Sequence, residues 1–525
     1  MSQGNIGDLF KTAGEQPQQI EALISGTIPT WIKGGLLRNG PGQFEVGKDK
    51  YNHWFDGHSL LHRFDFDNGV VKYHSKFLES NSRAEAIKKN RIVVTEFGTV
   101  TAPDPCMNIF QRFASYFTRP TPSDNNPVSI TNLGDGVYVS TDSRILRRID
   151  PETLDTGERV DISQLVAVNV VATHPHTDPD GTYYNLGTNM KSGCYHVIKI
   201  SPGANKADPV EGAEILHTIP MENSRRPAYY HSFSMTVNYI IFHEQPYRFS
   251  PLGLLTRNFN KKGIDELMEF DPSLKSIFHI CDKRTGEVRS LKYVTKPFVN
   301  FHSMNAYEKD DHLIVDVCAA DGGAQYDRLY LRSLGKLIDS KDLDEQFTSD
   351  QLTHPRRFVL PLDIAKDGPR NVNLVKLEDG FTSATATLKN DGCVHLTYEP
   401  LHEEDESPGI GFDFPTMNYN FYNGRPYRYS YGARFSIPAD RIIKLDVQNK
   451  TTQEWQEDDC YPSEPIFVPA PDALKEDEGV VLSLVLSPRK DKSTFLLVLD
   501  GESFKELGRA TIPYDFPYGL HGAFV

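Results

Sequence analysis

Residues 312–320 read HLIVDVCAA, and a second run of the same character, RRFVLPLDI, occupies residues 356–364. Both runs are rich in β-branched and other apolar residues, and Asp, Gly or Pro residues border each of them. Short runs with these borders are typical of β-strands. The two stretches therefore predict strands, and Cys318 inside the first is expected to be a buried small hydrophobic residue.

The same pattern continues through most of the chain in both directions. Further strand-like runs are RIVVTEF (91–97), GVYVST (136–141), YHVIKI (195–200), NYIIFHE (238–244), CVHLTYEP (393–400), RIIKLDV (441–447), GVVLSLVLS (479–487) and FLLVLD (495–500). Turn dipeptides such as Asp180-Gly181 and Asn423-Gly424 separate them. Only residues 8–25, 106–118 and 328–346 favour helices. We therefore predict one large all-β unit over residues 1–525, with a β-propeller as the preferred form. No sequence repeat gives a blade count.

Composition narrows the class of protein. The 525-residue chain carries a formal net charge of -15 without a stripe of Lys or Arg, so nucleic acid is not an expected partner. The 30 Phe and 24 Tyr suit strands and apolar ligand walls. Six scattered cysteines lack any CxxC pair and indicate a reducing compartment. The N-terminal residues have no apolar signal region, so we expect a cytoplasmic protein.

Seventeen histidines offer candidate metal ligands, and most have structural explanations. His53, His58 and His62 lie in YNHWFDGHSLLHRF, which is interpreted as a turn followed by an alternating strand. Four others have a different setting, since each is flanked by apolar or small residues where a neutral imidazole needs a specific partner. They are His174, His231, His302 and His521.

The spacing of these four histidines matches no local metal motif. They are separated by 57, 71 and 219 residues, so the pattern alone leaves ordinary buried histidines as an alternative. Acidic residues in apolar surroundings are candidates to accept the second N–H of a metal-bound imidazole. Asp142, Asp413 and Glu464 fit this description, although each can also be a turn or surface carboxylate.

Several longer motifs occur in a fixed order along nearly the whole chain, from about residue 28 to the C-terminus. They are LLRNGPG (36–42), YNHWFDG (51–57), RIVVTEFGT (91–99), PDPC (103–106), HPH (174–176), YYHSF (229–233), SEPIFVPAP (463–471), GVVLS (479–483) and the closing His521-Gly522 segment. In these motifs the chain resembles the carotenoid cleavage oxygenase family, in its animal branch.

The resemblance implies a seven-bladed β-propeller with a helical and loop dome over its top face. It implies an Fe(II) ion held on the propeller axis by His174, His231, His302 and His521. The family places three glutamates behind these histidines, whereas this chain has Asp142, Asp413 and Glu464 at those positions. The resemblance pairs Asp142 with His231, Asp413 with His302 and Glu464 with His521. The shorter aspartates put metal retention and rate in question more than the fold.

The resemblance also assigns residues around the metal. Thr141 corresponds to a threonine that crowds one open coordination position, and Phe97 and Tyr229 correspond to positions near the reacting substrate. For both aromatic residues, plain core packing is the alternative. Residues 106–118 can be a core helix, but the family implies a membrane-contacting helix at the mouth of a tunnel, with Cys106 as a candidate palmitoylation site.

The implied activity is oxidative cleavage of a carotenoid or apocarotenoid double bond by O2, giving two carbonyl products. Eccentric 9′,10′ cleavage is favoured, and central 15,15′ cleavage to retinal, with or without isomerisation, is an alternative. A retinyl-ester isomerohydrolase shares the same iron site and is a second alternative. A carotenoid-binding propeller with little chemistry is the third, and the two aspartates are its support. Sequence alone does not fix the oligomeric state.

Overall fold

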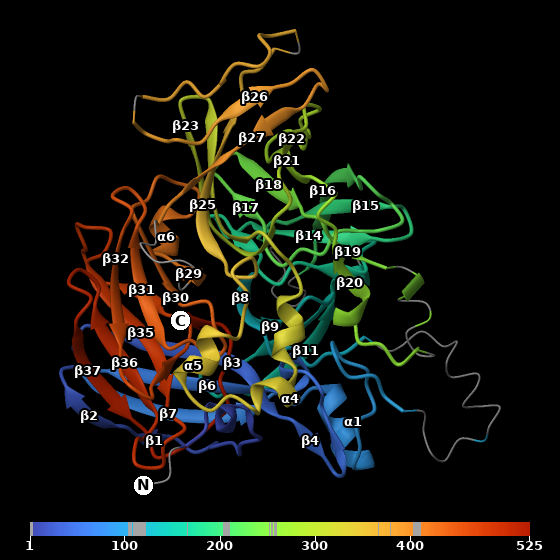
Figure 1. Cartoon of the computed structure of the whole chain (residues 1–525). Helices are drawn as coiled ribbons and strands as arrows, with labels where there is room; N and C mark the ends of the chain where they lie inside the picture. The colour runs from blue at the N-terminus through green and yellow to red at the C-terminus, as the bar shows by residue number, and fades with distance from the viewer. Residues whose placement is uncertain are drawn as a thin grey trace.

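Seven β-sheets of four to six strands surround a common axis and form a seven-bladed propeller (Figure 1). This confirms the predicted all-β architecture. The computed structural model describes residues 4–525 apart from 103–107, 109–121, 165, 203–209, 251, 254–255, 257–259, 366, 379 and 403–410.

The first four blades are filled largely in chain order and mainly with antiparallel neighbours, although blades one and four each take strands from later parts of the chain. Blade one holds β1 (Ile20–Glu21), β7 (Val70–Phe77), β6 (His58–Asp67), β3 (Gly34–Gln43) and β38 (Gly522–Phe524). Blade two holds β11 (Thr156–Asp161), β10 (Ile145–Ile149), β9 (Gly136–Ser140) and β8 (Ser129–Leu133). Blade three holds β12 (Val170–Val171), β13 (His176–Thr177), β14 (Tyr183–Asn189), β15 (Cys194–Ile200) and β16 (Ala213–Pro220). Blade four holds β17 (Ser234–Met235), β18 (Tyr239–Glu244), β21 (Ser276–Asp282), β22 (Tyr293–Thr295), β27 (Val394–Leu396) and β26 (Ala386–Leu388).

The remaining three blades complete the ring. Blade five holds β23 (Val299–Lys309), β24 (His312–Ala320), β25 (His354–Pro361) and β28 (Tyr398–Pro400). Blade six holds β29 (Asp413–Thr416), β30 (Tyr429–Ala433), β31 (Arg441–Asp446) and β32 (Thr451–Gln456). Blade seven holds β2 (Leu23–Gly26), β37 (Glu506–Thr511), β36 (Phe495–Asp500), β35 (Gly479–Leu486), β33 (Tyr461–Pro462) and β34 (Ile466–Pro469). Two separate strand pairs are β4 (Glu45–Val46) with β5 (Asp49–Lys50), and β19 (Tyr247–Phe249) with β20 (Met268–Phe270).

The helices in the described part of the chain are short. They are the 3-10 helices η1 (Ile6–Phe10), η2 (Trp54–Asp56), η3 (Ile162–Gln164), η4 (Asp265–Leu267) and η5 (Gln325–Leu329), and the α-helices α1 (Asn81–Lys89), α4 (Leu331–Leu334), α5 (Ser340–Asp344) and α6 (Tyr419–Tyr422). Residues around η2, η5 and α5 form the dome over one end of the propeller axis. Side chains from these segments line the cavity described below.

Strand β24 shows why residues 312–320 are apolar almost throughout, without alternating apolar and polar residues. All nine of its residues are buried, since neighbouring blades cover both faces of the sheet. The one charged residue in the run is Asp316, and two hydrogen bonds of 2.8 Å from Arg357 neutralise its carboxylate. The hydroxyl of Tyr427 donates a third bond to Asp316.

Some local predictions were wrong. Residues 8–25 form no helix beyond η1 and instead continue into β1 and β2. These strands form because β1 pairs with β7 in blade one and β2 pairs with β37 in blade seven. Residues 91–97 are irregular and not a strand. Residues 328–346 hold two short helices, α4 and α5, rather than one long helix. The predicted helix at 106–118 lies outside the described residues, apart from residue 108.

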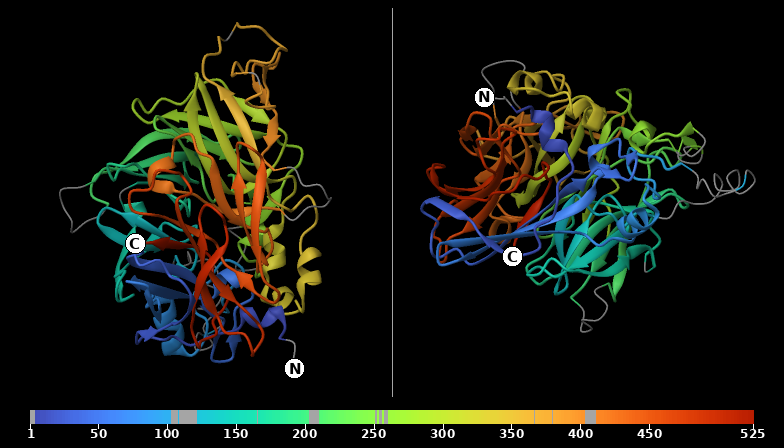
Figure 2. Two further views of the ribbon diagram at one scale, coloured as in Figure 1. Left: turned by 90° about the vertical axis from the view of Figure 1, so that its left-hand side faces the viewer. Right: turned by 90° about the horizontal axis from the view of Figure 1, so that it is seen from below.

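Two strand pairs between the N-terminal and C-terminal parts of the chain close the ring. β2 pairs with β37 in blade seven, and β38 pairs with β3 in blade one. Figure 2 shows the blue N-terminal strands beside the red C-terminal strands in both of its views. Gly35 and Val525 exchange two backbone hydrogen bonds, of 2.8 and 2.9 Å, at the end of the second pair. Closure of this kind packs blade one against blade seven, so that sheet faces which an open ring would expose are buried.

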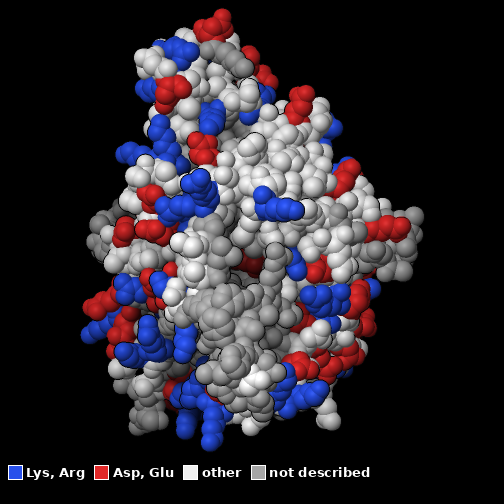
Figure 3. All heavy atoms as spheres, turned by 90° about the vertical axis from the view of Figure 1, so that its right-hand side faces the viewer, with Lys and Arg blue, Asp and Glu red and all other residues white. Residues whose placement is uncertain are grey.

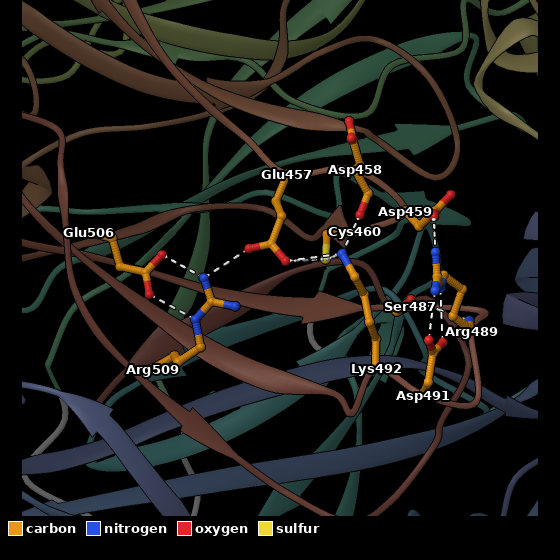
Figure 4. A network of polar contacts seen from close by, with 10 residues as sticks. All are labelled: Glu457, Asp458, Asp459, Cys460, Ser487, Arg489, Asp491, Lys492, Glu506 and Arg509. Atoms are coloured by element: carbon orange, nitrogen blue, oxygen red, sulfur yellow. Dashed lines mark hydrogen bonds and ion pairs between the residues drawn. The ribbon is translucent and has the colours of Figure 1, made fainter.

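A network of ion pairs joins the outer part of blade seven to the turn after β32 (Figure 4). Arg509 contacts Glu506 and Glu457, and Lys492 contacts Glu457 at 3.1 Å. Cys460 lies in the same network, but burial raises the pKa of its thiol to about 12 and so keeps it protonated. These ion pairs are partly exposed to solvent, so each contributes at most about 1 kcal/mol to stability.

Deletion of residues 522–525 tests the closing pair. Each lost backbone hydrogen bond removes about 1 kcal/mol, and the Gly35–Val525 pair alone makes two. We expect the shortened chain to have a lower midpoint in thermal unfolding followed by circular dichroism. Leu474→Ala, at a side chain 95% exposed, is the control and leaves the midpoint unchanged. An unchanged midpoint in the shortened chain contradicts the closing role of β38.

Candidate metal centre

The four histidines singled out in the sequence meet at the propeller axis. His174 lies between β12 and β13, His231 precedes β17, His302 belongs to β23, and His521 directly precedes β38. One ring nitrogen from each lies within 4.8 Å of those of the other three. These segments belong to blades three, four, five and one. The histidines are therefore separated in the sequence by the residues that build the blades between them.

Backbone hydrogen bonds between blades hold the histidine-bearing segments together. The N–H groups of Thr173 and His174 both donate to the carbonyl of His231, at 3.1 and 3.3 Å. The N–H of His521 donates to the carbonyl of Val128 at 3.3 Å, which joins blade one to blade two. The imidazoles are therefore placed by main-chain contacts as well as by side-chain packing.

His302 and His521 are each oriented by a carboxylate from the neighbouring blade. Nδ1 of His302 lies 2.7 Å from Asp413, and Nδ1 of His521 lies 2.7 Å from Glu464. The Thr353 hydroxyl and the N–H of Phe414 donate to Asp413, which fixes that carboxylate in turn. Both contacts join the pairs that the sequence resemblance predicted.

Asp142 approaches His231 less closely. Its two oxygens lie 3.1 and 3.2 Å from Nδ1 of His231. The Tyr229 hydroxyl donates to Asp142 at 2.7 Å and lies 3.1 Å from the same Nδ1, so it contacts both groups. Thr173 also donates to Asp142, and the Tyr326 hydroxyl contacts that of Tyr229 at 2.5 Å. Tyr229 is therefore held behind the histidines by polar contacts.

His174 has no carboxylate partner in the described part of the chain, as the resemblance predicted. Its Nε2 lies 3.1 Å from Nε2 of His231. Burial lowers the pKa of His174 well below its ordinary value, and the neighbouring histidines, His521 first, lower it further. A neutral His174 is the form that binds a metal ion.

The hydrogen bonds define the tautomers that a metal centre needs. Because Nδ1 of His231, His302 and His521 each faces a carboxylate, that nitrogen carries the proton and Nε2 offers a lone pair to the centre. Nε2 of His302 is buried and has no hydrogen-bond partner. A buried polar atom without a partner is costly, and a bound metal ion would satisfy it.

The charges around the cluster also fit a divalent ion. Asp142, Asp413 and Glu464 contact the histidines, and Arg38 contacts Glu464, so this set carries a net of two negative charges. Burial would raise the pKa of Glu464, yet His521 and Arg38 lower it, and the net pKa lies below the ordinary value. The residues present therefore fit a metal ion held by four neutral imidazoles.

An apolar cavity of about 60 Å³ opens beside His231, His302 and His521. Its other walls are mostly aromatic and aliphatic and come from the propeller and the dome: Trp54, Phe55, Val128, Phe301, Gln325, Tyr326, Leu329, Phe347, Asp413, Phe414, Phe435, Ile437 and Leu520. This volume is enough for a few water-sized molecules. A long ligand would reach the histidines only if the aromatic walls moved.

A larger cavity of about 1140 Å³ lies on the other side of the same dome segments. Tyr51 and Asn52 line the larger cavity, whereas Trp54 and Phe55 line the smaller one. The larger cavity has a charged and polar lining that includes Lys50. It does not include any of the four histidines.

The other predicted residues lie around this site with different roles. Phe97 packs against Tyr326 with ring centroids 5.0 Å apart, one layer behind the cavity wall. Thr141 is half-buried beside Asp142 and is absent from the cavity lining. His53 and His62 are buried structural residues, bonded to the Tyr326 carbonyl and the Tyr73 hydroxyl respectively.

Four residues that contact the polar groups behind the histidines were not predicted from the sequence. Thr173, Tyr326 and Thr353 contact the carboxylate or tyrosine groups behind the histidines, and Arg38 contacts Glu464. Arg38 lies in a motif that was recognised, LLRNGPG, so a buried arginine beside apolar residues was an available signal. Thr173, Tyr326 and Thr353 have no comparable signal, because their roles depend on contacts between blades.

The fold and the site together define a β-propeller with a cluster of four histidines on its axis that could hold a metal ion. The chain matches the family model described as retinal pigment epithelial membrane protein over residues 9–525, and it belongs to that family. It is 43% identical to the mitochondrial carotenoid-cleaving dioxygenase of Mustela putorius furo, over 99% of this chain and 96% of that protein. It is 40% identical to the human beta,beta-carotene 15,15'-dioxygenase, over 97% of this chain and 93% of that protein. These matches confirm the resemblance inferred from the motifs.

Solved structures support the fold. A variant of the Synechocystis apocarotenoid oxygenase matches with a TM-score of 0.74 at 21% identity, over 100% of both chains. A chimera of that oxygenase with the retinal pigment epithelial protein matches with a TM-score of 0.75, over 99% of this chain and 98% of the chimera.

Tyr229→Phe tests the contact behind His231. The change removes the hydroxyl that donates to Asp142 while leaving the ring in place, and loss of such a partner costs about 10–100-fold in metal affinity. We expect weaker binding in a Co²⁺ titration followed by absorbance. Tyr293→Phe is the matched control, because it removes a buried hydroxyl of blade four that donates to the Pro361 carbonyl of blade five. Equal affinity in both variants would show that Tyr229 does not support the site.

Proposed function

We propose that this chain is an iron(II)-dependent dioxygenase that cleaves a double bond of a carotenoid or apocarotenoid with O2 and yields two carbonyl products. The convergence of His174, His231, His302 and His521 beside an apolar aromatic cavity carries the proposal. The family and the dioxygenase relatives support the reaction class.

In the proposed site the four imidazoles hold Fe(II), and Asp142, Asp413 and Glu464 orient three of them. Imidazole ligands suit several metals, including Zn, Cu and Ni, so the choice of iron rests on the family resemblance. Bound iron would supply the capacity to activate O2 at its open coordination positions. Thr141, beside Asp142, is proposed to restrict one of those positions.

The protein's own contribution would be to bind the polyene, orient one double bond and exclude water. Phe301 and Phe414 lie close to His231 and His302, so their rings are suited to contact the apolar chain next to the metal. Phe97 and Tyr229 are proposed to act from behind this wall, Phe97 through Tyr326 and Tyr229 through Asp142. Because the cavity is small, substrate binding would have to move parts of this lining.

Eccentric 9′,10′ cleavage is the preferred position. The mitochondrial carotenoid-cleaving relatives are 42–43% identical to this chain, and the 15,15'-dioxygenases are 40–41% identical. The margin is narrow, so central cleavage to retinal stays an alternative. A retinyl-ester isomerohydrolase stays another, since the family is described by the retinal pigment epithelial protein.

Metal content tests the site directly. His302→Ala removes the ligand whose Nε2 has no partner, so we expect the variant to lose the stoichiometric iron that the wild-type protein retains after anaerobic purification, measured by elemental analysis. His395→Ala is the control, because His395 also contacts a carboxylate, Asp391 at 2.8 Å, but lies outside the cluster. Full iron in His302→Ala would contradict the ligand role of His302. A metal-free wild type that binds carotenoid would favour the carotenoid-binding propeller with little chemistry.

Product analysis tests the reaction. Iron-loaded protein incubated with β-carotene, a xanthophyll and an apocarotenal is expected to consume one O2 for each pair of carbonyl products, identified by chromatography and mass spectrometry. Chain lengths of the products distinguish 9′,10′ from 15,15′ cleavage. Turnover of retinyl ester without O2 uptake would reject the dioxygenase and support the isomerohydrolase.

Peripheral membrane contact is proposed because carotenoids partition into lipid. Figure 3 shows a hollow on one face of the molecule, with mostly uncharged side chains above it and an acidic side chain inside it. None of the helices in the described ranges is long and apolar enough to cross a bilayer. The predicted membrane segment, residues 106–118 with Cys106, lies almost entirely outside the described residues.

The cellular location is also a proposal. The cytoplasmic location expected from the N-terminal residues stands against relatives that are named mitochondrial. We propose that the mitochondrion is the compartment to test first. Fractionation of cells that express the full chain would decide between the two.

A further inference from the structure

Arg38 is a buried cation at the junction of blades one and seven, and the proposed reaction does not use it. It lies in β3, and only 2% of its surface is exposed. Its Nη1 donates to the carbonyl of Glu464 at 3.0 Å and to the carboxylate of the same residue at 3.3 Å. Its Nη2 donates to the carbonyl of Leu520 at 2.6 Å. A buried guanidinium with this many acceptors is fixed in one orientation.

These acceptors belong to the residues that place His521. Glu464 uses Oε1 to contact Nδ1 of His521 and Oε2 to accept from Arg38 and from the N–H of Gly522. Leu520 directly precedes His521 in the chain. Arg38 therefore holds both the carboxylate that orients the imidazole and the backbone that carries it.

The same residues belong to the strand pair that closes the ring. Arg38 is opposite Gly522 in the register of β3 with β38. A Cβ on Gly522 would lie 2.5 Å from the Leu37 carbonyl oxygen and 2.6 Å from Cδ of Arg38, so only glycine allows this approach. The packing of Arg38 thus depends on β38 lying in place.

We propose that Arg38 is a positioning residue that couples closure of the propeller to metal binding at His521. With Arg38 in place, pairing of β38 with β3 brings His521 and Glu464 into register. By linkage, a metal ion bound to His521 stabilises the closed strand pair against local opening. This inference rests on the metal centre proposed above.

Arg38→Met and Arg38→Lys test the coupling. Arg38→Met removes every contact to Glu464 and Leu520, so we expect Co²⁺ affinity, measured by competition with a chelator, to fall about 10–100-fold. Arg38→Lys keeps the positive charge but lacks the planar set of guanidinium N–H donors, and it is expected to give an intermediate affinity. It also preserves the test if Arg38→Met does not fold.

Arg357→Met is the matched control. Arg357 is also buried, at 4% exposure, and donates two hydrogen bonds to Asp316 in blade five, away from the four histidines. We expect this variant to lose thermal stability while it keeps the wild-type metal affinity. A loss of affinity equal to that of Arg38→Met would show that any damage to a buried ion pair weakens the site, and would overturn the specific role of Arg38.

Hydrogen exchange supplies a readout apart from activity. In the wild-type protein, amides of β38 and of its partner Gly35 are expected to exchange more slowly with metal bound than after chelation. In Arg38→Lys this difference should shrink. Wild-type affinity and an unchanged metal-dependent difference in both Arg38 variants would overturn the inference. A wild type that binds no metal, with His302→Ala indistinguishable from it, would instead reject the metal centre itself.

Discussion

The pairing of β38 with β3 is the contact on which both the closed ring and the cluster of four histidines depend. A propeller is stable as a closed ring because closure buries the faces of the first and last blades against each other. In this protein the residue directly before the closing strand is His521, and the carboxylate that orients it comes from blade seven. An open ring would separate His521 from both Glu464 and the other three histidines.

Each of the seven blades supplies one polar group to the cluster. Blades one to seven contribute His521, Asp142, His174, His231, His302, Asp413 and Glu464 in that order. The axis of a propeller is the place where all blades approach one another, so a site built there needs only one residue from each. This arrangement also explains why no two ligands lie close together in the sequence.

The strands could be predicted from the sequence largely as they occur, because runs such as 312–320 and 495–500 are apolar and bordered by turn residues. Residues 8–25 were mistaken for a helix because their strands add to blades formed elsewhere in the chain, and local pattern does not contain that pairing. The four histidines needed the resemblance, since spacing set by blade length carries no metal signature.

The contacts between carboxylates and histidines were also predicted, but how the two aspartates reach their partners was not. Asp413 is shorter than glutamate, yet it approaches His302 as closely as Glu464 approaches His521, at 2.7 Å. Its strand β29 lies next to β23, so the adjacent blade makes up for the missing methylene. Sequence can register the change of residue type at this position, but the compensation depends on the distance between two blades.

Asp142 contacts its histidine, His231, in a different way. It reaches His231 from blade two across blade three, and its contacts with Nδ1 are 3.1 and 3.2 Å. The Tyr229 hydroxyl lies within hydrogen-bonding distance of both groups and supplies a second polar contact to the imidazole. At Asp413 the closeness of the two blades compensates for the shorter side chain. At Asp142 the hydroxyl of Tyr229 supplies an additional contact. The two aspartates are therefore weak support for a carotenoid-binding propeller with little chemistry. Their partners, His231 and His302, are both still oriented toward a common centre.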